Sequence, residues 1–364
     1  MRIALVHDYL MQDGGAERTL LAFHRLFPTA PIFTLFYDPK RVHPDFTKAK
    51  IIPSFLNSFP FAPSKYQWYL PLMPHAAESI DLSGYDLILS SSSSIIKGII
   101  APPGATHICY CHNPTRFLWQ ERHGYVNDLP QPGIIKRLLP FYLHHLRQWD
   151  IIAADRPDVL LTNSKTSQER IRRFYRRDAK VIFPPVDTHL IQPSSTNDGY
   201  WLIGGRLVGY KRFDLAVTAF ARLNLPLKVF GTGPEEKKLR ALAGPKTEFV
   251  GAVDEKTKFE LYQHAIGFLY PHVEDFGITA IEAMAAGKPV IAYGKGGIVE
   301  TVVDGKTGKF FHVQSWEALA NLILRFDPKQ FSHTDIRAHA EQFSHQRFAE
   351  ELKQTIVEIT KQPI

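Results

Sequence analysis

The chain has 364 residues, of which 45% are hydrophobic and 22% are charged. It is therefore a globular protein that is too long for one ordinary core, and we expect two domains. Its only cysteines, Cys109 and Cys111, match no zinc-binding spacing, which favours buried thiols in a reducing cytoplasm. We recognise no signal peptide and no apolar run of about 18 residues, so we expect neither export nor a membrane span.

The net charge of +7 is concentrated in one segment of the first half. Residues 136–180 contain eleven Lys and Arg against five Asp and Glu, a net charge of +6. Such a segment suits an anionic membrane, a nucleic acid or no particular partner. Because we expect no interleaved aromatic residues to be exposed in it and recognise no nucleic-acid motif, we favour a membrane surface and expect no nucleic acid. The expected location is the cytoplasm, with peripheral contact to the inner face of the cytoplasmic membrane.

The N-terminal half alternates apolar runs with polar loops, as α/β proteins do. Residues 2–7 predict a strand, which is followed by Gly14 and Gly15 and then by a helix from Thr19. A strand, a glycine loop and a helix in this order place backbone N–H groups against a diphosphate. The pattern is not G-x-G-x-x-G, however, and a tight turn explains the two glycines at least as well. Further strands are predicted at 31–36, 86–89, 107–110 and 159–162.

The strand at 107–110 delivers His112 to its carboxyl end, where active sites of open α/β sheets lie. A structural role for His112 is about equally well supported. Arg116 and Trp119 follow, and they are candidates for the wall of an acceptor site, although core packing explains the tryptophan equally well. The serine run at 90–94 is more simply explained as a strand end that packs on a helix than as a hydroxyl-rich sugar site.

A polar linker at 193–199 precedes the second half of the chain. The first loop of that half, at 204–212, contains Arg206 and Lys211. Arginine offers a planar fork and lysine a point charge to phosphate oxygens, so this loop predicts a diphosphate site, with solvated surface charge as the alternative. The predicted elements that follow are strands at 227–230, 249–253 and 267–270 and a helix at 213–223.

The most informative stretch is residues 274–297, EDFGITAIEAMAAGKPVIAYGKGG. Glu274 precedes a short apolar helix that contains a second carboxylate, Glu282, and that ends at Gly287. A carboxylate among alanines and isoleucines needs a partner. The N–H groups of residues 277–279 at the start of this helix form an anion site. A capped core helix with one surface glutamate is the alternative explanation.

This stretch resembles the signature of the retaining family-4 glycosyltransferases, which have the GT-B fold. The likeness is specific from Gly204 to about Gly308. It is weaker in the first half, where MRIALVHDYLMQDGGAERTLLAF and YCHNPTRFLW resemble bacterial mannosyltransferases of O-antigen and exopolysaccharide assembly. The resemblance implies an α/β protein with two facing, doubly wound Rossmann-like domains and a deep interdomain cleft. The first domain is expected at 1–192, completed by a C-terminal helix at 343–364, and the nucleotide-sugar domain at 193–342.

The resemblance also implies retaining transfer of a sugar, best interpreted as mannose from GDP-mannose, to a lipid-linked or oligosaccharide acceptor. It assigns Glu282 to the ribose, and Glu274 and His112 to the sugar hydroxyls. The cations Arg206 and Lys211 face the diphosphate in this interpretation and replace a metal, and no D-x-D motif lies where a metal would be used. No cofactor or metal is therefore expected. Further donor-binding positions follow by likeness: Gly14, Gly15, Gly205, Gly231, Gly251, Val253, Phe276, Gly277, Ile278 and Thr279.

Three alternative functions remain open. A transferase of the same fold that uses a UDP-sugar differs only in its donor. An isomerase or phosphorylase would turn over sugar without adding it to an acceptor, or would depend on inorganic phosphate. A non-catalytic, two-domain sugar-binding protein would need no pair of cations such as Arg206 and Lys211, which counts against it.

Overall fold

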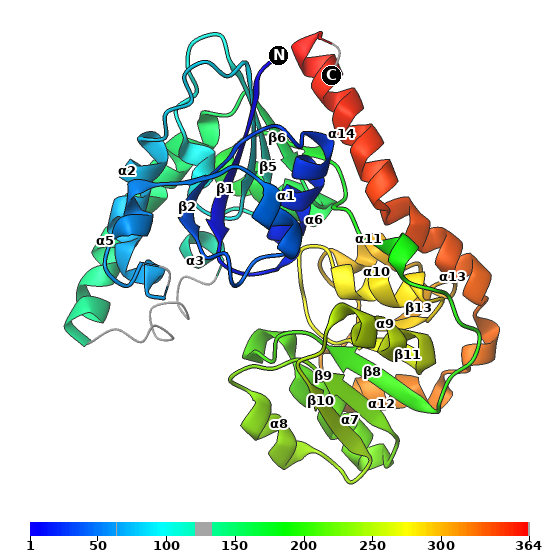
Figure 1. Ribbon diagram of the computed structural model, residues 1–364. Coiled ribbons are helices and arrows are strands. Elements are labelled where there is room, and N and C mark those ends of the chain that lie inside the picture. The colour runs from blue at the N-terminus through cyan, green and yellow to red at the C-terminus, as the bar shows by residue number, and fades with distance from the viewer. Residues whose placement is uncertain (63, 121–132, 363–364) are drawn as a thin grey trace. The chain divides into compact units, whose positions relative to one another are not determined.

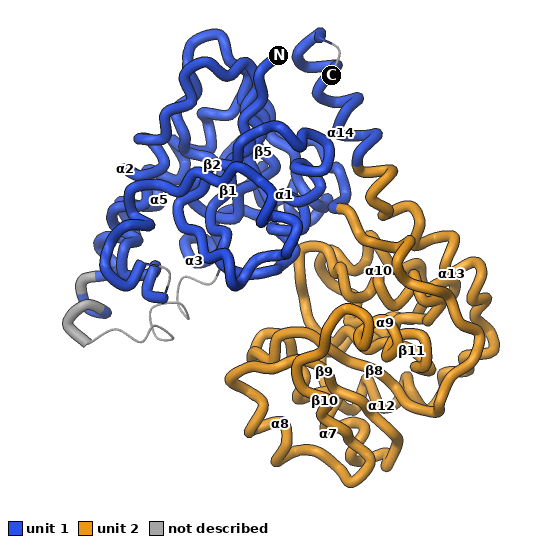
Figure 2. The backbone as a smooth tube through the Cα atoms, in the orientation of Figure 1, with its two compact units in different colours: residues 1–184, 349–364 blue, residues 185–348 orange. Residues whose placement is uncertain are grey.

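The computed structural model describes residues 1–62, 64–120 and 133–362. These residues form two compact units, unit 1 with residues 1–184 and 349–364 and unit 2 with residues 185–348 (Figure 2). Each unit is built on one parallel β-sheet with helices packed against it (Figure 1). The prediction of an α/β protein with two Rossmann-like domains is therefore confirmed.

Unit 1 contains a seven-stranded parallel sheet in the order β3-β2-β1-β4-β5-β6-β7. Its strands are β1 (Ile3–Leu10), β2 (Ile32–Tyr37), β3 (Ile51–Pro53), β4 (Leu87–Ser92), β5 (Thr106–Cys111), β6 (Val159–Thr162) and β7 (Lys180–Val181). Its described α-helices are α1 (Gly15–Leu26), α2 (Met73–Glu78), α3 (Arg116–Trp119), α5 (Gly133–Asp155) and α6 (Lys165–Tyr175). The last helix, α14 (His345–Thr360), starts in unit 2 and belongs to unit 1 from Ala349 onward.

Strand β5 shows how both faces of this sheet are covered. Because successive side chains of a strand point to opposite faces, Tyr110 points away from its neighbours Cys109 and Cys111. The Tyr110 ring lies 6.1 Å from the Phe23 ring of α1, whereas both cysteines belong to a core cluster with Ala154 of α5. Both thiols are free and buried. Burial raises the pKa of the Cys109 thiol to about 12, which fits the predicted inert role.

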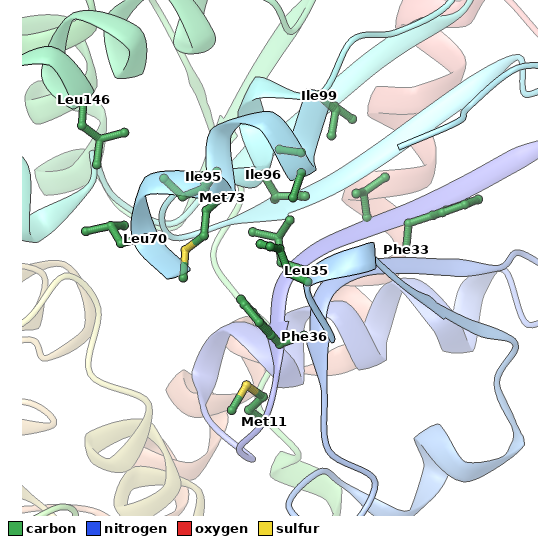
Figure 3. Packing of buried hydrophobic residues seen from close by; sticks show 14 of the residues in the cluster. Met11, Phe33, Leu35, Phe36, Leu70, Met73, Ile95, Ile96, Ile99 and Leu146 are labelled. Atoms are coloured by element: carbon green, nitrogen blue, oxygen red, sulfur yellow. The ribbon is translucent and has the colours of Figure 1, made fainter. Parts of the chain in front are cut away.

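The larger core of unit 1 fills the space between the sheet and the segments that follow β3 and β4. Figure 3 shows Leu35 and Phe36 of β2 close to Met73 of α2, with Ile95 and Ile96 from the segment after β4 nearby. Burial of an apolar side chain of this size contributes roughly 1.5–3 kcal/mol. The cluster therefore fixes these segments, and the loops between them, against the sheet.

Unit 2 contains a six-stranded parallel sheet in the order β10-β9-β8-β11-β12-β13. Its strands are β8 (Tyr200–Gly204), β9 (Leu227–Phe230), β10 (Thr247–Gly251), β11 (Ala265–Tyr270), β12 (Val290–Tyr293) and β13 (Gly308–Phe311). Its helices include α7 (Phe213–Leu223), α8 (Glu236–Leu242), α9 (Glu255–His264), α10 (Ile278–Ala285), α11 (Ile298–Thr301), α12 (Trp316–Arg325) and α13 (His333–Ala340).

Both sheets reverse their strand order beside the first strand of the unit. In unit 1, β2 and β3 lie on one side of β1, and the next strand, β4, lies on its other side. In unit 2, β9 and β10 lie on one side of β8, and β11 lies on its other side. Open α/β sheets bind ligands at the carboxyl ends of the strands beside such a reversal. The loops after β1 and β4, and after β8 and β11, are therefore the places where a site is expected.

The serine run differs from the predicted position, because Ser90–Ser92 lie inside β4 rather than after it. The loop that follows is held by Asp8, whose carboxylate accepts hydrogen bonds from the four backbone N–H groups of residues 93–96 at 2.6 to 2.9 Å. Asp8 is buried, and a buried carboxylate requires such donors. The tight turn at the end of β4 is therefore a structural feature of the sheet edge.

Candidate functional site

In unit 2, Lys211 and Glu274 meet where the strand order reverses. Lys211 follows β8 and Glu274 follows β11, and Lys211 Nζ lies 3.0 Å from Glu274 Oε1. The Tyr270 hydroxyl donates a hydrogen bond of 2.8 Å to Glu274 Oε2. His272 Nε2 lies 3.3 Å from the same oxygen without the alignment of a hydrogen bond. The fold thus brings together Lys211 and Glu274, two candidate site residues that the sequence predicts in separate motifs.

The electrostatics of this group keep Glu274 ionised. Burial raises the pKa of Glu274, but the contact with His272, the charge of Lys211 and the Tyr270 hydrogen bond together hold that pKa well below its usual range. Burial lowers the pKa of His272, so its imidazole is neutral at pH 7. Lys211 and Glu274 side chains are 12% and 21% exposed. Lys211 and Glu274 therefore place a cation and a carboxylate side by side, and both can reach a ligand.

Three neighbouring strands of unit 2 have a glycine with a positive φ as their last residue or directly after it. The φ angles are 129° at Gly205, 106° at Gly231 and 83° at Gly251, a region that side chains rarely adopt. A Cβ atom on Gly231 would lie 2.0 Å from the Gly205 carbonyl oxygen. The carboxyl ends of β8, β9 and β10 therefore form a surface of backbone atoms, which suits close approach of a flat ring. Val253 follows directly after this surface.

The N-terminus of α10 lies immediately after Glu274. Gly277 is its N-cap residue with a φ of 105°, and a Cβ atom there would lie 3.1 Å from the Tyr270 hydroxyl. The first N–H groups of a helix have no acceptor within the helix, so Ile278 and Thr279 carry donors suited to an anion. Phe276 is buried, and its ring packs on that of Phe343 at 5.7 Å.

Glu282 has the partners that its burial requires. It lies within α10 and is 9% exposed. Lys258 Nζ and the Tyr262 hydroxyl, both from α9, donate hydrogen bonds of 2.7 and 2.9 Å to its two carboxylate oxygens. Each oxygen of a carboxylate has further acceptor capacity, so Glu282 can still accept a ligand hydroxyl.

In unit 1, His112 lies one strand away from the reversal of strand order, which falls between β1 and β4. His112 follows β5, and its Nε2 lies 2.9 Å from Ser91 Oγ of β4. Burial, with a smaller effect of His7, lowers the pKa of His112 to about 3, so the ring is neutral at pH 7. Gly14 is the N-cap residue of α1, and its N–H donates to Glu17 Oε2 at 3.1 Å. Gly15 begins α1.

The two candidate acceptor residues lie on the short helix α3. Trp119 Nε1 donates a hydrogen bond of 2.8 Å to the buried Asp150, and the Trp119 ring stacks on Phe174 at 5.0 Å. Asp150 also forms a buried ion pair with Lys97 at 2.5 Å. These contacts support the core-packing explanation of Trp119. Arg116 is half-buried on the same helix.

Sequence reasoning missed Tyr270 and His272 beside Glu274, and Lys258 and Tyr262 beside Glu282. His272 had a usable signal, because it follows the end of β11 as His112 follows the end of β5. The α9 residues had none, since only the fold brings α9 against α10. Arg206, by contrast, lies where it was expected, exposed in the loop after β8.

Two sequence profiles cover most of the chain. The profile described as "Glycosyltransferase Family 4" matches residues 13–190, and the profile described as "Glycosyl transferases group 1" matches residues 189–352. The chain is 27% identical over 249 residues to alpha-1,3/1,6-mannosyltransferase ALG2 of Dictyostelium discoideum, covering 55% of this chain and 56% of that protein. It is 34% identical over 196 residues to glycogen synthase of Mycobacterium tuberculosis, covering 48% and 46%.

Among solved structures, Anabaena HepE in complex with UDP-glucose superposes with a TM-score of 0.73 at 18% identity, covering 98% of this chain and 100% of that chain. This likeness supports the GT-B fold. The chain spans about half the length of the curated relatives it matches.

Proposed function

Because the chain belongs to the family-4 glycosyltransferases with the GT-B fold, we propose that it transfers a sugar from a nucleotide donor with retention of the anomeric configuration. The proposed donor is GDP-mannose, and the acceptor is a lipid-linked or oligosaccharide precursor of a cell-surface polysaccharide. The likeness of the chain to ALG2 supports mannose. The observation that carries the proposal is the pairing of Lys211 with Glu274 at the carboxyl edge of the unit 2 sheet.

The proposed chemistry needs stabilisation of the diphosphate that leaves the anomeric carbon. Lys211, Arg206 and the N–H groups at the start of α10 supply fixed positive charge and donors for it. No metal takes part in this proposal. Among the described residues, no group of three or more His, Cys, Asp or Glu side chains is arranged to hold a metal ion.

The carboxylates have binding roles in this proposal. Glu274 is held in its ionised form, so it accepts hydrogen bonds from sugar hydroxyls and orients the ring, together with His112. Glu282 accepts hydrogen bonds from the ribose, and the backbone surface at Gly231 and Gly251 receives the base. A phosphate oxygen of the donor, rather than a side chain, takes the proton from the acceptor hydroxyl.

Calorimetric titration of the purified protein with GDP, UDP and ADP, without metal and with magnesium, tests the donor. Tight binding of GDP in both conditions is the expected result. Incubation with GDP-mannose and candidate acceptors, followed by NMR analysis of the product's anomeric configuration, then tests transfer and retention. If none of the three nucleotides binds, the transferase proposal fails and free sugars become the ligands to test.

A UDP-sugar is the second candidate donor. The solved complex of Anabaena HepE contains UDP-glucose, and the backbone surface that faces the base carries few side chains that would select guanine. Tighter binding of UDP than of GDP in the same titration would favour this alternative. Binding of free sugars alone would favour a non-catalytic sugar-binding protein.

The proposed partner of unit 1 is an anionic membrane surface. Unit 1 contains 24 Lys and Arg against 18 Asp and Glu, so it carries nearly all of the net charge. Arg172 and Arg173 are exposed on α6 within the basic segment 136–180. Large apolar side chains are exposed on the same unit, with Phe61 71%, Trp68 50% and Phe141 71% exposed. Phe141 lies inside segment 136–180, so the expectation that this segment exposes no aromatic residue is wrong. Lys65 Nζ lies over the rings of Phe61 and Trp68, and aromatic rings beside cations suit the headgroup region of a bilayer.

Co-sedimentation with vesicles tests this partner. We expect binding to vesicles that contain anionic lipid, weaker binding at high salt, and loss of binding in a Phe61→Ser/Trp68→Ser variant. Val313→Ser, which removes an exposed apolar side chain of unit 2, is the control. Equal binding to neutral and anionic vesicles would rule out the electrostatic part of this proposal. Within the described residues, no helix has the length and apolar character of a membrane span.

A further inference from the structure

We propose that Ser91 is a positioning residue that sets the tautomer and the orientation of His112. Its importance for activity depends on the proposed function, in which His112 contacts the donor sugar. Ser91 is completely buried in β4, next to the loop that the sugar would approach. The serine run was not expected to be functional, so this role comes from the geometry alone.

Two contacts of the Ser91 hydroxyl bear on which atom donates. Ser91 Oγ lies 2.9 Å from His112 Nε2 and donates to the carbonyl oxygen of Ala16 in α1 at 3.5 Å. A carbonyl oxygen can only accept a hydrogen bond. In the proposed assignment, the single hydroxyl proton of Ser91 points to the Ala16 carbonyl oxygen, and the serine oxygen accepts the proton of His112 Nε2. His112 therefore carries its proton on Nε2 and keeps a free lone pair on Nδ1.

This tautomer matters because His112 is neutral, as burial lowers its pKa to about 3. The two nitrogens of a neutral imidazole have opposite hydrogen-bonding roles. With the proton held on Nε2, the Nδ1 atom accepts a hydrogen bond from a sugar hydroxyl. The other tautomer would carry an N–H group at Nδ1, which could not accept a hydrogen bond from the hydroxyl group of the sugar.

Ser91 also connects His112 to the glycine loop. Its backbone carbonyl oxygen lies 3.0 Å from His7 Nδ1, which must be the donor. His7 Nε2 lies 3.7 Å from Glu17 Oε1, and the other carboxylate oxygen of Glu17 accepts from the N–H of Gly14. His7 and Glu17 are both buried. A continuous series of polar contacts thus joins the two candidate elements of unit 1.

The chain contains a matched control one residue earlier in the same strand. Ser90 Oγ lies 2.8 Å from His107 Nε2, and both residues are completely buried. Burial lowers the pKa of His107 to about 3, as it does for His112. Ser90 points to the opposite face of the sheet from Ser91. Ser90→Ala therefore removes the same type of contact from a histidine that has no proposed role.

The test is NMR spectroscopy of the full-length protein labelled with ¹⁵N at histidine, which reports the tautomer of each ring. His112→Gln and His107→Gln variants assign the two signals. We expect a single Nε2–H tautomer for His112, lost or mixed in Ser91→Ala and unchanged in Ser90→Ala. An unchanged His112 tautomer in Ser91→Ala, or the same change in both serine variants, would overturn the proposal.

Kinetics then separate this proposal from the proposed function. We expect Ser91→Ala to lower kcat/KM for the donor by about tenfold, the effect of one hydrogen bond. Ser90→Ala should leave kcat/KM close to the wild-type value, because the contact that it removes is to His107, which has no proposed role. If His112→Gln retains full activity while Ser91→Ala still alters the tautomer, the positioning contact stands and the proposed role of His112 fails.

Discussion

Lys211 is the residue on which donor binding depends most in the proposed function. Its Nζ is held beside Glu274, where a charge-assisted hydrogen bond to a phosphate contributes about 1.5–3 kcal/mol. We expect Lys211→Ala to weaken binding of the preferred nucleoside diphosphate by roughly ten- to a hundredfold, measured by calorimetry. Arg212→Gln is the control, because the neighbouring Arg212 is paired with Asp214 at 3.1 Å. Equal losses in both variants would contradict a specific role of Lys211.

The depressed pKa of Glu274 predicts a pH dependence of stability. A carboxyl group whose pKa is lower in the folded protein than its ordinary value of 4.5 stabilises the fold above that value, and this contribution disappears as the pH falls toward the folded pKa. The difference in unfolding free energy between wild type and Glu274→Gln should be constant from pH 8 to about pH 6 and should shrink below about pH 4.5. Urea denaturation across this range measures it. A difference that grows in acid would show that Glu274 is not held in its ionised form.

At the scale of single residues, the sequence predicted the important charges but not their partners. Glu274, Glu282 and Lys211 stand in motifs of fixed spacing, and spacing is visible in a sequence. The partners come from other elements, such as Lys258 of α9 for Glu282, and their positions depend on how helices pack. The tautomer of His112 likewise depends on Ser91 of another strand, so no local pattern could reveal it.

At the scale of secondary-structure elements, the glycines at the ends of β8, β9 and β10 predict a specific sensitivity. Gly231 has a φ of 106°, and a Cβ atom there would meet the Gly205 carbonyl oxygen at 2.0 Å. Gly231→Ala should therefore destabilise the protein by about 2 kcal/mol or more, through backbone strain and a forced shift of β8. Gly209→Ala is the control, since no atom lies within 4 Å of a Cβ atom at that position. Similar midpoints of chemical denaturation for the two variants would refute this prediction.

Elements with a strong periodic pattern were predicted closely. The structure places α7 at Phe213–Leu223 and β9 at Leu227–Phe230, as predicted, whereas α10 ends at Ala285, two residues before the predicted end at Gly287. Strand β4 was predicted too short because its last three residues are serines. The hydroxyl groups of those serines find hydrogen-bond partners outside the strand, such as His107 for Ser90. Strand propensity carries no information about such partners.

At the scale of the whole molecule, length and alternation were sufficient to predict two α/β units, because one core cannot grow to 364 residues. The two units differ in charge, since unit 2 contains 19 Lys and Arg against 18 Asp and Glu and is nearly neutral. A nearly neutral unit with a local pair of cations suits selective binding of a small anion. A basic unit suits an extended anionic surface.

The separation into units leads to a prediction about unit 2 alone. Residues 185–348 are contiguous and have their own apolar core, and the segment after Pro193 packs within the unit through Ser194 to Ala286 at 3.0 Å and Lys288 to Thr196 at 2.6 Å. We therefore expect this fragment, expressed by itself, to unfold cooperatively in urea and to bind the same nucleoside diphosphate as the whole chain.

The fragment should show no sugar transfer, because His112 and the glycine loop belong to unit 1. Calorimetry on the fragment and on its Lys211→Ala variant measures the binding, which should be weaker in the variant by the same factor as in the whole chain. A fragment that folds cooperatively but binds no nucleotide would mean that unit 1 supplies essential binding groups. In that case Gly14 and Gly15, whose role rests on likeness, would become the next residues to substitute in the whole chain.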